Sequence, residues 1–405
     1  MTENCDLPTL PALDAATAAY VRLHRDDDVE RLALSPGEAA GVDLHLALQE
    51  IEGRQRLGRK VPSWAAVEGL RLPPRLALEQ CSGEAAALYK ARLAHSLLPR
   101  GGSMADLTGG LGVDFAAQAR LFESCTYVER RAELCALARH NLPLLGLARA
   151  RVACAAAEDY LAAMEPVDWL FLDPSRRDEA GRKTVLLADC RPDVSELAPL
   201  LLEKGRYVLV KLSPMLDTAD AVRRLPSVAG VHVVAHGGEC KELLLLLSRG
   251  HEGEPLVTCA DGQRLFSFRP AEEQAATPAQ AATLRRYLYE PGPALLKAGA
   301  LKLTAVRFGL AKLHPNSHLY TSDALVGDFP GRTFLVEGVY GFSKKELRRF
   351  AANCPRANLT LRNFPGTTAD LRRRLRLKEG GDRYCFATTL ADGGKVLIVC
   401  RKVKG

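Results

Sequence analysis

The spacing of hydrophobic and polar positions changes several times along the chain, and each change predicts a different kind of structure. Residues 1–98 have helical spacing, with an alanine-rich stretch at 15–19 and a leucine-rich stretch at 42–51. A last helix is predicted over 83–98, where Ser82 is placed to cap its amino end. This first region is therefore expected to be helical.

From residue 103 the pattern changes to short apolar runs that alternate with helical segments. Five of these runs predict strands, which begin near residues 104, 126, 151, 168 and 207. Their alternation with helices predicts a parallel sheet that is covered on both faces. Two more strands, 231–235 and 242–247, are joined by only a few residues and are expected to be antiparallel. The predicted fold class is α/β, with a Rossmann-like sheet that ends in an antiparallel hairpin.

The rest of the chain is predicted to form smaller α+β units. An alanine- and glutamine-rich helix is expected over 271–286. Further on, Ser343 and Glu346 form a capping box that opens a basic helix, and Asp392-Gly393-Gly394 turns a hairpin. The four predicted domains are residues 1–98, 99–250, 251–325 and 326–405.

The composition of the chain mainly excludes classes of protein. Hydrophobic residues make up 47% of the chain and charged residues 25%, as in ordinary globular proteins. The leucine run 243–247 is far shorter than the ~18 apolar residues of a membrane span, and residues 1–6 lack the basic start of a secretory signal. Eleven cysteines occur without a Cys-x-x-Cys pair, so neither a disulfide framework nor a zinc ribbon is expected. A cytoplasmic protein without a metal is predicted.

Charge is distributed unevenly along the chain. The net charge is +7, and residues 341–405 hold sixteen lysines and arginines against five aspartates and glutamates. The other residues together have a net charge of −4. A positive excess that is confined to one domain indicates a polyanionic partner, most often nucleic acid. A merely solvated basic face is the alternative.

A glycine turn follows the first predicted strand and opens a helix. It reads Asp106-Leu107-Thr108-Gly109-Gly110-Leu111-Gly112, and glycines let a backbone approach a ligand closely. Glu129 ends the next strand, 23 residues after Asp106, where a carboxylate can bind both hydroxyls of a ribose. With the terminal hairpin, these features resemble class I S-adenosylmethionine-dependent methyltransferases more than dinucleotide oxidoreductases. A tight strand–helix turn without a ligand is the plainer alternative.

The resemblance implies S-adenosyl-L-methionine as the cofactor. The candidate cofactor-binding residues are Asp106, Thr108, Gly109, Gly110, Gly112, Glu129, Glu158 and Ser82. Glu158 is included because Ala156 lies where such enzymes often have an Asp that holds the adenine amine. Glu158, Asp159 or a backbone contact is expected to take that place.

Longer stretches extend the resemblance over the whole chain. They are Gln49–Gln55, Leu78–Ser82, Leu172–Asp178, Lys211–Asp217, Lys312–Tyr320 and Arg362–Pro365. With these stretches the chain resembles a Bacteroidetes-type methyltransferase family. Its members combine a helical amino-terminal region, a methyltransferase domain, a small ferredoxin-like domain and a carboxy-terminal THUMP-like domain. THUMP domains are associated with binding of structured RNA, which agrees with the separate argument from charge.

Asp173 ends the fourth predicted strand and is expected to lie near the methyl donor, because ligands bind at the carboxyl ends of such strands. Enzymes that methylate amines commonly have an Asp/Asn-Pro-Pro-aromatic motif at this point. Here the motif is Asp173-Pro174-Ser175-Arg176, which lacks the second proline and the stacking aromatic. An exocyclic amine of a base is therefore supported as the acceptor only in part.

Four charged residues match a second pattern. The order of Lys90, Asp173, Lys211 and Glu242 resembles the Lys-Asp-Lys-Glu tetrad of ribose 2′-O-methyltransferases. In that tetrad a lysine flanked by carboxylates deprotonates or orients the hydroxyl, which is a poor nucleophile until a neighbour holds its proton. These four are the predicted catalytic residues. Alternatively, Lys90 and Glu242 are surface charges and Lys211 contacts a phosphate.

Basic residues near Asp173 and in the tail are candidates for contacts with phosphates. A predicted helix over 370–377 has leucines for its core face, so its arginines are expected to cover the outer face. The RNA-binding candidates are Arg176, Arg177, Lys344, Lys345, Arg372, Arg373 and Arg376. The polar residues His314, Asn316, His318 and Tyr320 lack a cysteine or acid cluster beside them, so they are interpreted as structural or RNA contacts rather than metal ligands.

The sequence thus predicts an S-adenosylmethionine-dependent RNA methyltransferase that acts on a structured RNA such as tRNA or rRNA. Its acceptor is either a ribose 2′-hydroxyl or a base exocyclic amine. The altered Asp-Pro-Ser-Arg motif and Ala156 leave an alternative open, a non-catalytic RNA-binding protein with a degenerate donor pocket. A small-molecule methyltransferase is disfavoured by the basic tail.

Overall fold

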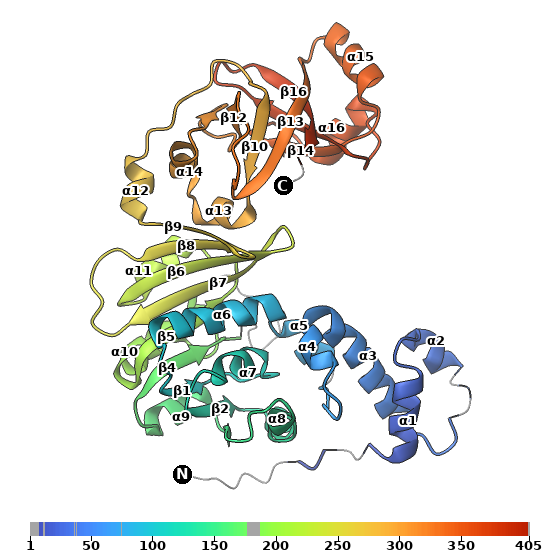
Figure 1. The fold of residues 1–405 in the computed structure, drawn as a ribbon, viewed down its shortest axis with the longest axis vertical. Coiled ribbons are helices and arrows are strands. Elements are labelled where there is room, and N and C mark those ends of the chain that lie inside the picture. The colour runs from blue at the N-terminus through green and yellow to red at the C-terminus, as the bar shows by residue number, and fades with distance from the viewer. Residues whose placement is uncertain are drawn as a thin grey trace. The chain divides into compact units, whose positions relative to one another are not determined.

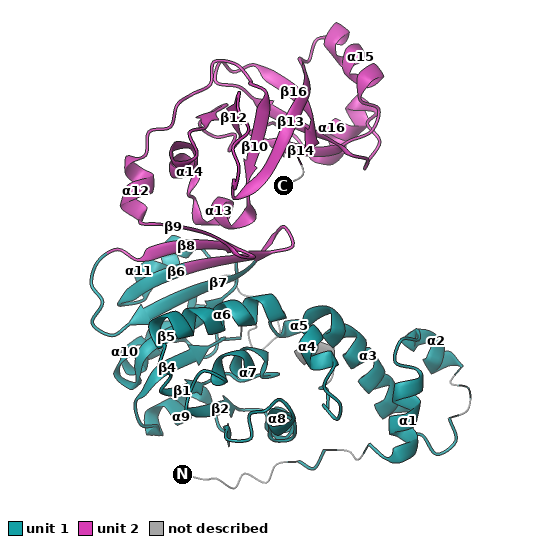
Figure 2. Cartoon of the chain, in the orientation of Figure 1, with its two compact units in different colours: residues 1–231, 241–253 teal, residues 232–240, 254–405 magenta. Residues whose placement is uncertain are grey.

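The chain folds into two compact units. One contains residues 1–231 and 241–253, and the other contains residues 232–240 and 254–405 (Figure 2). The computed structural model describes residues 8–10, 13–35, 37, 39–73, 75–175 and 187–403.

The amino-terminal region is helical, as predicted. Its helices are α1 (Ala15–Leu23), α2 (Val29–Leu34), α3 (Leu44–Lys60), α4 (Pro62–Ala65), α5 (Arg75–Gln80) and α6 (Glu84–Leu97) (Figure 1). Helix α3 begins at Asp43, whose carboxylate accepts the N–H of Leu46. Helix α6 begins at Gly83 without a side-chain cap, so the predicted cap by Ser82 is wrong. The Ser82 hydroxyl hydrogen-bonds to two carboxylates instead.

The predicted sheet is present. Its strands are β1 (Ser103–Asp106), β2 (Ser124–Glu129), β3 (Arg151–Cys154), β4 (Val167–Leu172), β5 (Gly205–Leu212), β6 (Val228–His236) and β7 (Glu239–Ser248). They follow the order β3-β2-β1-β4-β5-β7-β6. The pairs among β1 to β5 are parallel, whereas β7 runs antiparallel to β5 and places Leu244 opposite Lys211. This is the Rossmann-like α/β fold with an antiparallel end that the sequence predicts.

Helices alternate with these strands. They are α7 (Val113–Ala119), α8 (Ala132–Leu144), α9 (Ala157–Ala163), the short 3-10 helix η1 (Leu187–Asp189), α10 (Val194–Lys204) and α11 (Thr218–Arg224). Helix α6 packs against α7, and α8 packs against β2 and β3. The strands bury large side chains such as Tyr127 and Trp169 completely. Because the parallel strands share one direction, the residues at their carboxyl ends converge on one edge of the sheet.

The second unit contains another sheet. Its strands follow the order β11-β12-β10-β13-β16-β15-β14. They are β10 (Tyr287–Pro291), β11 (Ala311–Lys312), β12 (Tyr320–Ser322), β13 (Gly331–Tyr340), β14 (Asn358–Arg362), β15 (Arg383–Thr389) and β16 (Lys395–Lys402). The predicted hairpin around Asp392 is the antiparallel pair β15–β16. The domain boundary predicted after residue 325 falls between β12 and β13, which are strands of this one sheet.

The other elements of this unit are an antiparallel hairpin and five helices. They are β8 (Leu256–Asp261), β9 (Arg264–Phe268), α12 (Pro270–Ala275), α13 (Pro293–Ala298), α14 (Leu301–Arg307), α15 (Lys344–Asn353) and α16 (Thr368–Leu375). Helix α15 begins at Ser343, whose hydroxyl accepts the N–H of Glu346 as predicted. Phe350 of α15 and Leu371 and Leu375 of α16 are buried in one core with residues of β14 to β16. Among the described residues, no helix has the length and hydropathy that a membrane crossing requires.

The helix predicted over residues 271–286 is wrong. Helix α12 ends at Ala275, just before Thr277 and Pro278. Pro278 disfavours the helical conformation of Thr277, the residue before it, and this effect outweighs the helix propensity of the alanines. The chain beyond it is extended, and the Lys312 N–H donates to the Ala279 carbonyl at 2.8 Å.

Candidate active site

The glycine turn connects β1 to α7, and two of its glycines are required by the packing and backbone conformation of the turn. Gly109 lies against the ring of Tyr127, where an added Cβ atom would be 2.1 Å from a ring carbon. Gly112, which begins α7, has φ +87°, a conformation that other residues rarely adopt. The Tyr127 hydroxyl donates to the Gly110 carbonyl at 2.5 Å and holds the turn in place. The turn is thus a tightly packed backbone segment at the end of β1, in which Gly109 and Gly112 are buried.

Glu129 ends β2 beside this turn. One of its carboxylate oxygens accepts the N–H of Gly110 at 3.0 Å. The other oxygen accepts the N–H of Arg131 at 3.0 Å and its guanidinium Nε at 3.1 Å. The Glu129 side chain is 7% exposed, whereas that of Arg131 is 47% exposed. The carboxylate is therefore held rigidly, and one of its partners is free to move away.

Asp106 is a buried carboxylate at the end of β1. It is 1% exposed, and the Thr108 N–H donates to it at 2.9 Å. Burial raises the pKa of Asp106 well above its usual value; the hydrogen bond from Thr108 opposes this shift, and the charges of Asp114, Asp173 and Glu129 add to it. Strongly shifted carboxyl groups of this kind are typical of functional sites.

The four residues of the predicted tetrad lie together in the structure. The Lys211 Nζ atom, at the end of β5, is 2.6 Å from a carboxylate oxygen of Asp173, which follows β4. The Lys90 Nζ atom, on α6, forms an ion pair with Glu242 of β7. Lys211 also lies 3.9 Å from Glu242, which joins the two pairs. The structure thus brings side chains from four elements into one group.

A fifth charged residue, Asp114, completes this group. It lies in the first turn of α7, and its carboxylate oxygens are 3.0 Å from Lys90 and 3.6 Å from Lys211. We refer to Lys90, Asp114, Asp173, Lys211 and Glu242 as the ion cluster. Sequence reasoning missed Asp114, because only the packing of α6 against α7 brings Lys90 beside this acid.

Burial differs sharply among the members of the ion cluster. The side chain of Lys90 is 0% exposed, and those of Glu242, Asp114 and Lys211 are 5%, 10% and 11% exposed. The side chain of Asp173 is 37% exposed. Asp173 is therefore the carboxylate of the ion cluster that a molecule from solution can reach most easily.

The pKa values of the ion cluster follow from burial and mutual attraction. Burial lowers the pKa of Lys211, but the carboxylates of Asp173, Asp114 and Glu242 outweigh burial and raise this pKa above its ordinary value. Burial raises the pKa of Asp173, and Lys211 opposes that shift only in part. Burial also acts on Asp114, but Lys90 and Lys211 lower its pKa overall. Lys211 is thus firmly charged, and Asp173 is the more basic carboxylate.

Two hydroxyl groups connect the ion cluster to its surroundings. The Ser82 hydroxyl is 2.6 Å from Asp114 and 3.0 Å from Glu242, and it accepts a hydrogen bond from Lys90 at 3.3 Å. Ser82, a predicted cofactor-binding residue, therefore lies within the ion cluster. The Thr108 hydroxyl accepts the N–H of Asp173 at 2.6 Å, which ties the glycine turn to the ion cluster.

Comparisons with known proteins place this chain in a family. A ferredoxin-like domain model matches residues 287–330, and a THUMP domain-like model matches residues 331–402. A Porphyromonas gingivalis W83 protein assigned as a methyltransferase has a crystal structure that is similar with a TM-score of 0.85 and 37% sequence identity. The similarity covers 96% of this chain and 98% of that one. The chain belongs to that methyltransferase family.

A relative from Mycobacterium tuberculosis supports the same conclusion. It is an uncharacterised S-adenosylmethionine-dependent methyltransferase that is 28% identical over 339 residues, which span 80% of this chain and 87% of the relative. The protein is an S-adenosylmethionine-dependent methyltransferase, as the sequence predicts. Its glycine turn, the buried Asp106 and the Glu129 carboxylate are the candidates for holding this cofactor.

Other predicted site residues of the methyltransferase lie apart from the ion cluster or outside the described residues. Glu158 is exposed in the first turn of α9, and Ala156 begins that helix. Arg176 and Arg177 belong to residues 176–186, which lie outside the described residues, as do Arg182 and Lys183. Ser175 and Arg191 pair on either side of that stretch, where the Ser175 N–H donates to the Arg191 carbonyl at 2.7 Å.

The RNA-binding candidates in the tail differ in their surroundings. Lys344 and Lys345 are exposed in the first turn of α15. Arg372 and Arg373 of α16 each pair with an acid, at 3.5 Å from Glu379 and 2.9 Å from Asp370. Arg376 is exposed and ends the helix with φ +51°.

The polar motif that follows β11 makes local contacts. The His314 Nδ1 atom is 3.0 Å from the Asn316 N–H and 3.0 Å from the Asn363 side-chain amide. The described residues contain no group of three or more histidines, cysteines and acids that could hold a metal ion. The interpretation of this motif as structural or as an RNA contact stays a prediction.

Proposed function

We propose that this methyltransferase methylates RNA at a ribose 2′-hydroxyl. The observation that carries the proposal is the ion cluster, in which Lys211 lies 2.6 Å from Asp173 and Lys90 pairs with Glu242. A ribose hydroxyl becomes a good nucleophile only when a neighbour holds its proton, so it needs a carboxylate placed and oriented in this way. The altered Asp-Pro-Ser-Arg motif, which lacks a stacking aromatic, gives less support to an exocyclic amine.

The donor end of the proposed site is the glycine turn. Asp106, Thr108 and the turn glycines would hold S-adenosylmethionine, and Glu129 would accept its ribose hydroxyls. One Glu129 oxygen accepts only the Gly110 N–H. The other would accept only the Arg131 N–H if the Arg131 side chain moved away, so each oxygen could then accept a ribose hydroxyl. When bound, the cofactor supplies a methyl group on a sulfonium sulfur, and the methyl–sulfur bond breaks as the acceptor oxygen bonds to the carbon. Glu158, on α9, is the candidate for contact with the adenine.

The acceptor end of the proposed site is Asp173. Its raised pKa makes it a better proton acceptor than an ordinary carboxylate. The hydroxyl proton passes to Asp173 and from there to water, so the carboxylate is restored. Lys211 is firmly charged and is not the base. It orients Asp173 and balances the negative charge, while the buried pair of Lys90 and Glu242 holds Lys211 in position.

Two observations support RNA as the substrate. The positive charge of the chain is concentrated in residues 341–405, with sixteen lysines and arginines against five acids. This segment overlaps residues 331–402, which match the THUMP domain-like model. A structured RNA, such as tRNA or rRNA, has the charge that such a domain would bind.

The experiment that tests the proposal is methylation of RNA from a strain that lacks the gene, with a labelled donor and nucleoside mass spectrometry. The parent protein is expected to form a 2′-O-methylated nucleoside, Asp173→Asn is expected to abolish it, and Lys211→Met is expected to form it far more slowly. Lys204→Met is a matched control, because Lys204 precedes β5 and lies roughly 20 Å from Lys211 at the strand's other end. A methylated base that forms at near-parent rate in Lys211→Met would contradict the proposal.

A further inference from the structure

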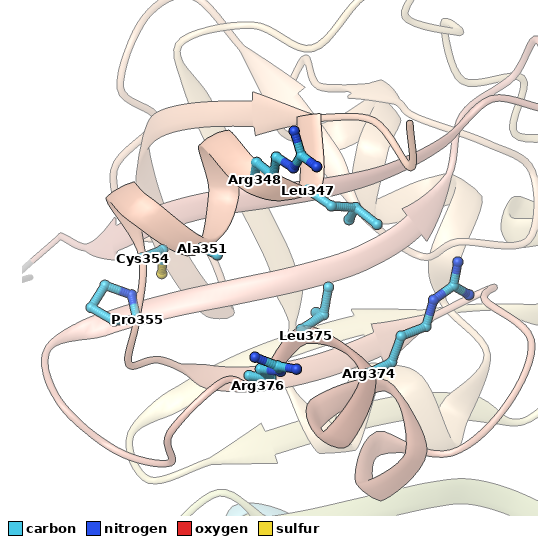
Figure 3. Close-up of a pocket in the computed structure, with 8 residues that line it drawn as sticks. All are labelled: Leu347, Arg348, Ala351, Cys354, Pro355, Arg374, Leu375 and Arg376. Atoms are coloured by element: carbon cyan, nitrogen blue, oxygen red, sulfur yellow. The ribbon is translucent and has the colours of Figure 1, made fainter. Parts of the chain in front are cut away.

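A pocket lies between helices α15 and α16 of the second unit. It has a volume of about 370 Å³, which is in the range of sites for small ligands. Leu347, Ala351, Cys354, Pro355 and Leu375 form its apolar lining. Arg348, Arg374 and Arg376 complete the lining (Figure 3). The pocket thus combines an apolar surface with three cationic groups, and no acid contributes to its lining.

The arginines of the two helices fall into two classes. Arg349, Arg372 and Arg373 each form an ion pair with an acid, Glu346 at 2.8 Å, Glu379 at 3.5 Å and Asp370 at 2.9 Å. Arg348, Arg374 and Arg376, which line the pocket, have no ion pair with an acid within the described part of the chain. The arginines beside the pocket are paired with acids of the same chain, whereas those that line it can pair with the phosphates of another molecule.

The arrangement on α15 is regular. Leu347 and Arg348 come four and three residues before Ala351, and Cys354, the residue that ends the helix, comes three after it, so these side chains lie along one side of the helix. On α16, Arg374 also lies over the ring of Phe342, with its guanidinium 5.8 Å from the ring centre. Stacking on an aromatic ring holds a guanidinium group flat and orients it.

We propose that this pocket binds one unpaired nucleotide of the RNA substrate. The base enters against the apolar lining, and the arginines contact its phosphates. A phosphate alone would not need the apolar surface, and a purely apolar ligand would not need three unpaired guanidinium groups. A duplex presents its phosphates but keeps its bases stacked inside, so it cannot fill the pocket. The proposal rests on the proposed function, because it assumes that RNA is the substrate.

The charged part of the proposal is tested with two variants of equal charge. One is Arg348→Gln with Arg374→Gln, and its control is Arg349→Gln with Arg401→Gln, two arginines that pair with acids and lie outside the pocket lining. Binding of a short labelled single-stranded RNA is measured by fluorescence anisotropy at several salt concentrations. The pocket pair is expected to lose about tenfold in affinity and about 1.4 in the slope of log affinity against log salt. The control pair should change affinity less than about threefold.

The apolar part is tested with Ala351→Leu, which fills the pocket and changes no charge. Its control is Ala352→Leu, on the same helix but not part of the pocket lining. Ala351→Leu is expected to weaken binding of single-stranded RNA about fivefold or more and to leave binding of duplex RNA unchanged. Ala352→Leu should bind both RNAs like the parent.

Equal losses of RNA affinity in the two arginine pairs would overturn the proposal that this pocket binds a nucleotide. Parent-like binding of single-stranded RNA by Ala351→Leu would also overturn it. Either result would leave the proposed function standing as long as the parent methylates RNA. A parent protein that binds and methylates no RNA would overturn the proposed function and the pocket together.

Discussion

The Lys211 ammonium group lies 2.6 Å from a carboxylate oxygen of Asp173, and this contact joins the carboxyl ends of two neighbouring parallel strands. It sets the protonation of both residues. The carboxylates around Lys211 raise its pKa, while Lys211 keeps the pKa of Asp173 lower than burial alone would make it. The two residues therefore have separate tasks in the proposed reaction, one as a fixed charge and the other as the proton acceptor.

The first prediction concerns the dependence of methyl transfer on pH. A protonated Asp173 cannot accept the hydroxyl proton, so the single-turnover rate should fall as pH decreases through the pKa of Asp173, above the usual 3.8. In Lys211→Met this pKa rises further, because the opposing positive charge is lost. The acid limb of the pH profile should move to higher pH, and the plateau rate should fall. An unchanged midpoint would show that Asp173 is not the group that titrates.

The second prediction concerns binding of the donor. Glu129→Ala should weaken binding of S-adenosylhomocysteine by about 2–4 kcal/mol, because two charge-assisted hydrogen bonds to the ribose are lost. Glu133→Ala removes the same charge from an exposed position on α8 and should bind the ligand like the parent. Isothermal titration calorimetry measures both variants. Parent-like affinity of the Glu129 variant would remove Glu129 from the donor site.

The third prediction concerns Asp106 and the effect of its burial on the stability of the fold. The unfolded chain releases the Asp106 proton near pH 4, whereas the folded protein holds it to higher pH. Stability should therefore fall as pH rises through this window, and Asp106→Asn should flatten that dependence. The variant should unfold at a higher temperature at neutral pH and yet bind the donor more weakly. A less stable variant with parent-like donor affinity would contradict the assignment.

The fourth prediction concerns Asp114, which the sequence did not single out. Asp114→Asn leaves two lysines of the ion cluster short of a negative charge, and breaking a buried ion pair costs about 3–5 kcal/mol of unfolding free energy. Urea denaturation of the donor-free protein measures this loss. Asp220→Asn removes an exposed carboxylate that pairs with Arg224 at 2.8 Å, and it should change stability little. Similar midpoints for the two variants would show that the ion cluster does not stabilise the fold.

Much of the sheet and of the ion cluster could be predicted because their signals are local or follow from chain direction. The glycine turn after β1 and the strand-end positions of Asp173 and Lys211 are examples. Strands that alternate with helices must be parallel, so their carboxyl ends meet at one edge. The sequence alone therefore predicts that side chains at these strand ends lie close together.

Other features of the site could not be predicted, because they depend on contacts between segments that are distant in the sequence. Ser82 has the right type and place for a helix cap, but its hydroxyl bonds to Asp114 and Glu242, 32 and 160 residues away. Asp114 resembles any acid in a first helical turn until α6 brings Lys90 beside it. The charge count of α16 did not reveal that acids neutralise Arg372 and Arg373.

The central claim is that the methyl group goes to a ribose hydroxyl of RNA through Asp173 and Lys211. Its most direct test is nucleoside mass spectrometry of RNA, from a strain that lacks the gene, after incubation with the parent protein or with Lys211→Met and a labelled donor. A 2′-O-methylated nucleoside is expected with the parent and only a small fraction of it with Lys211→Met. Label that appears on a base, at similar rates with both proteins, would contradict it.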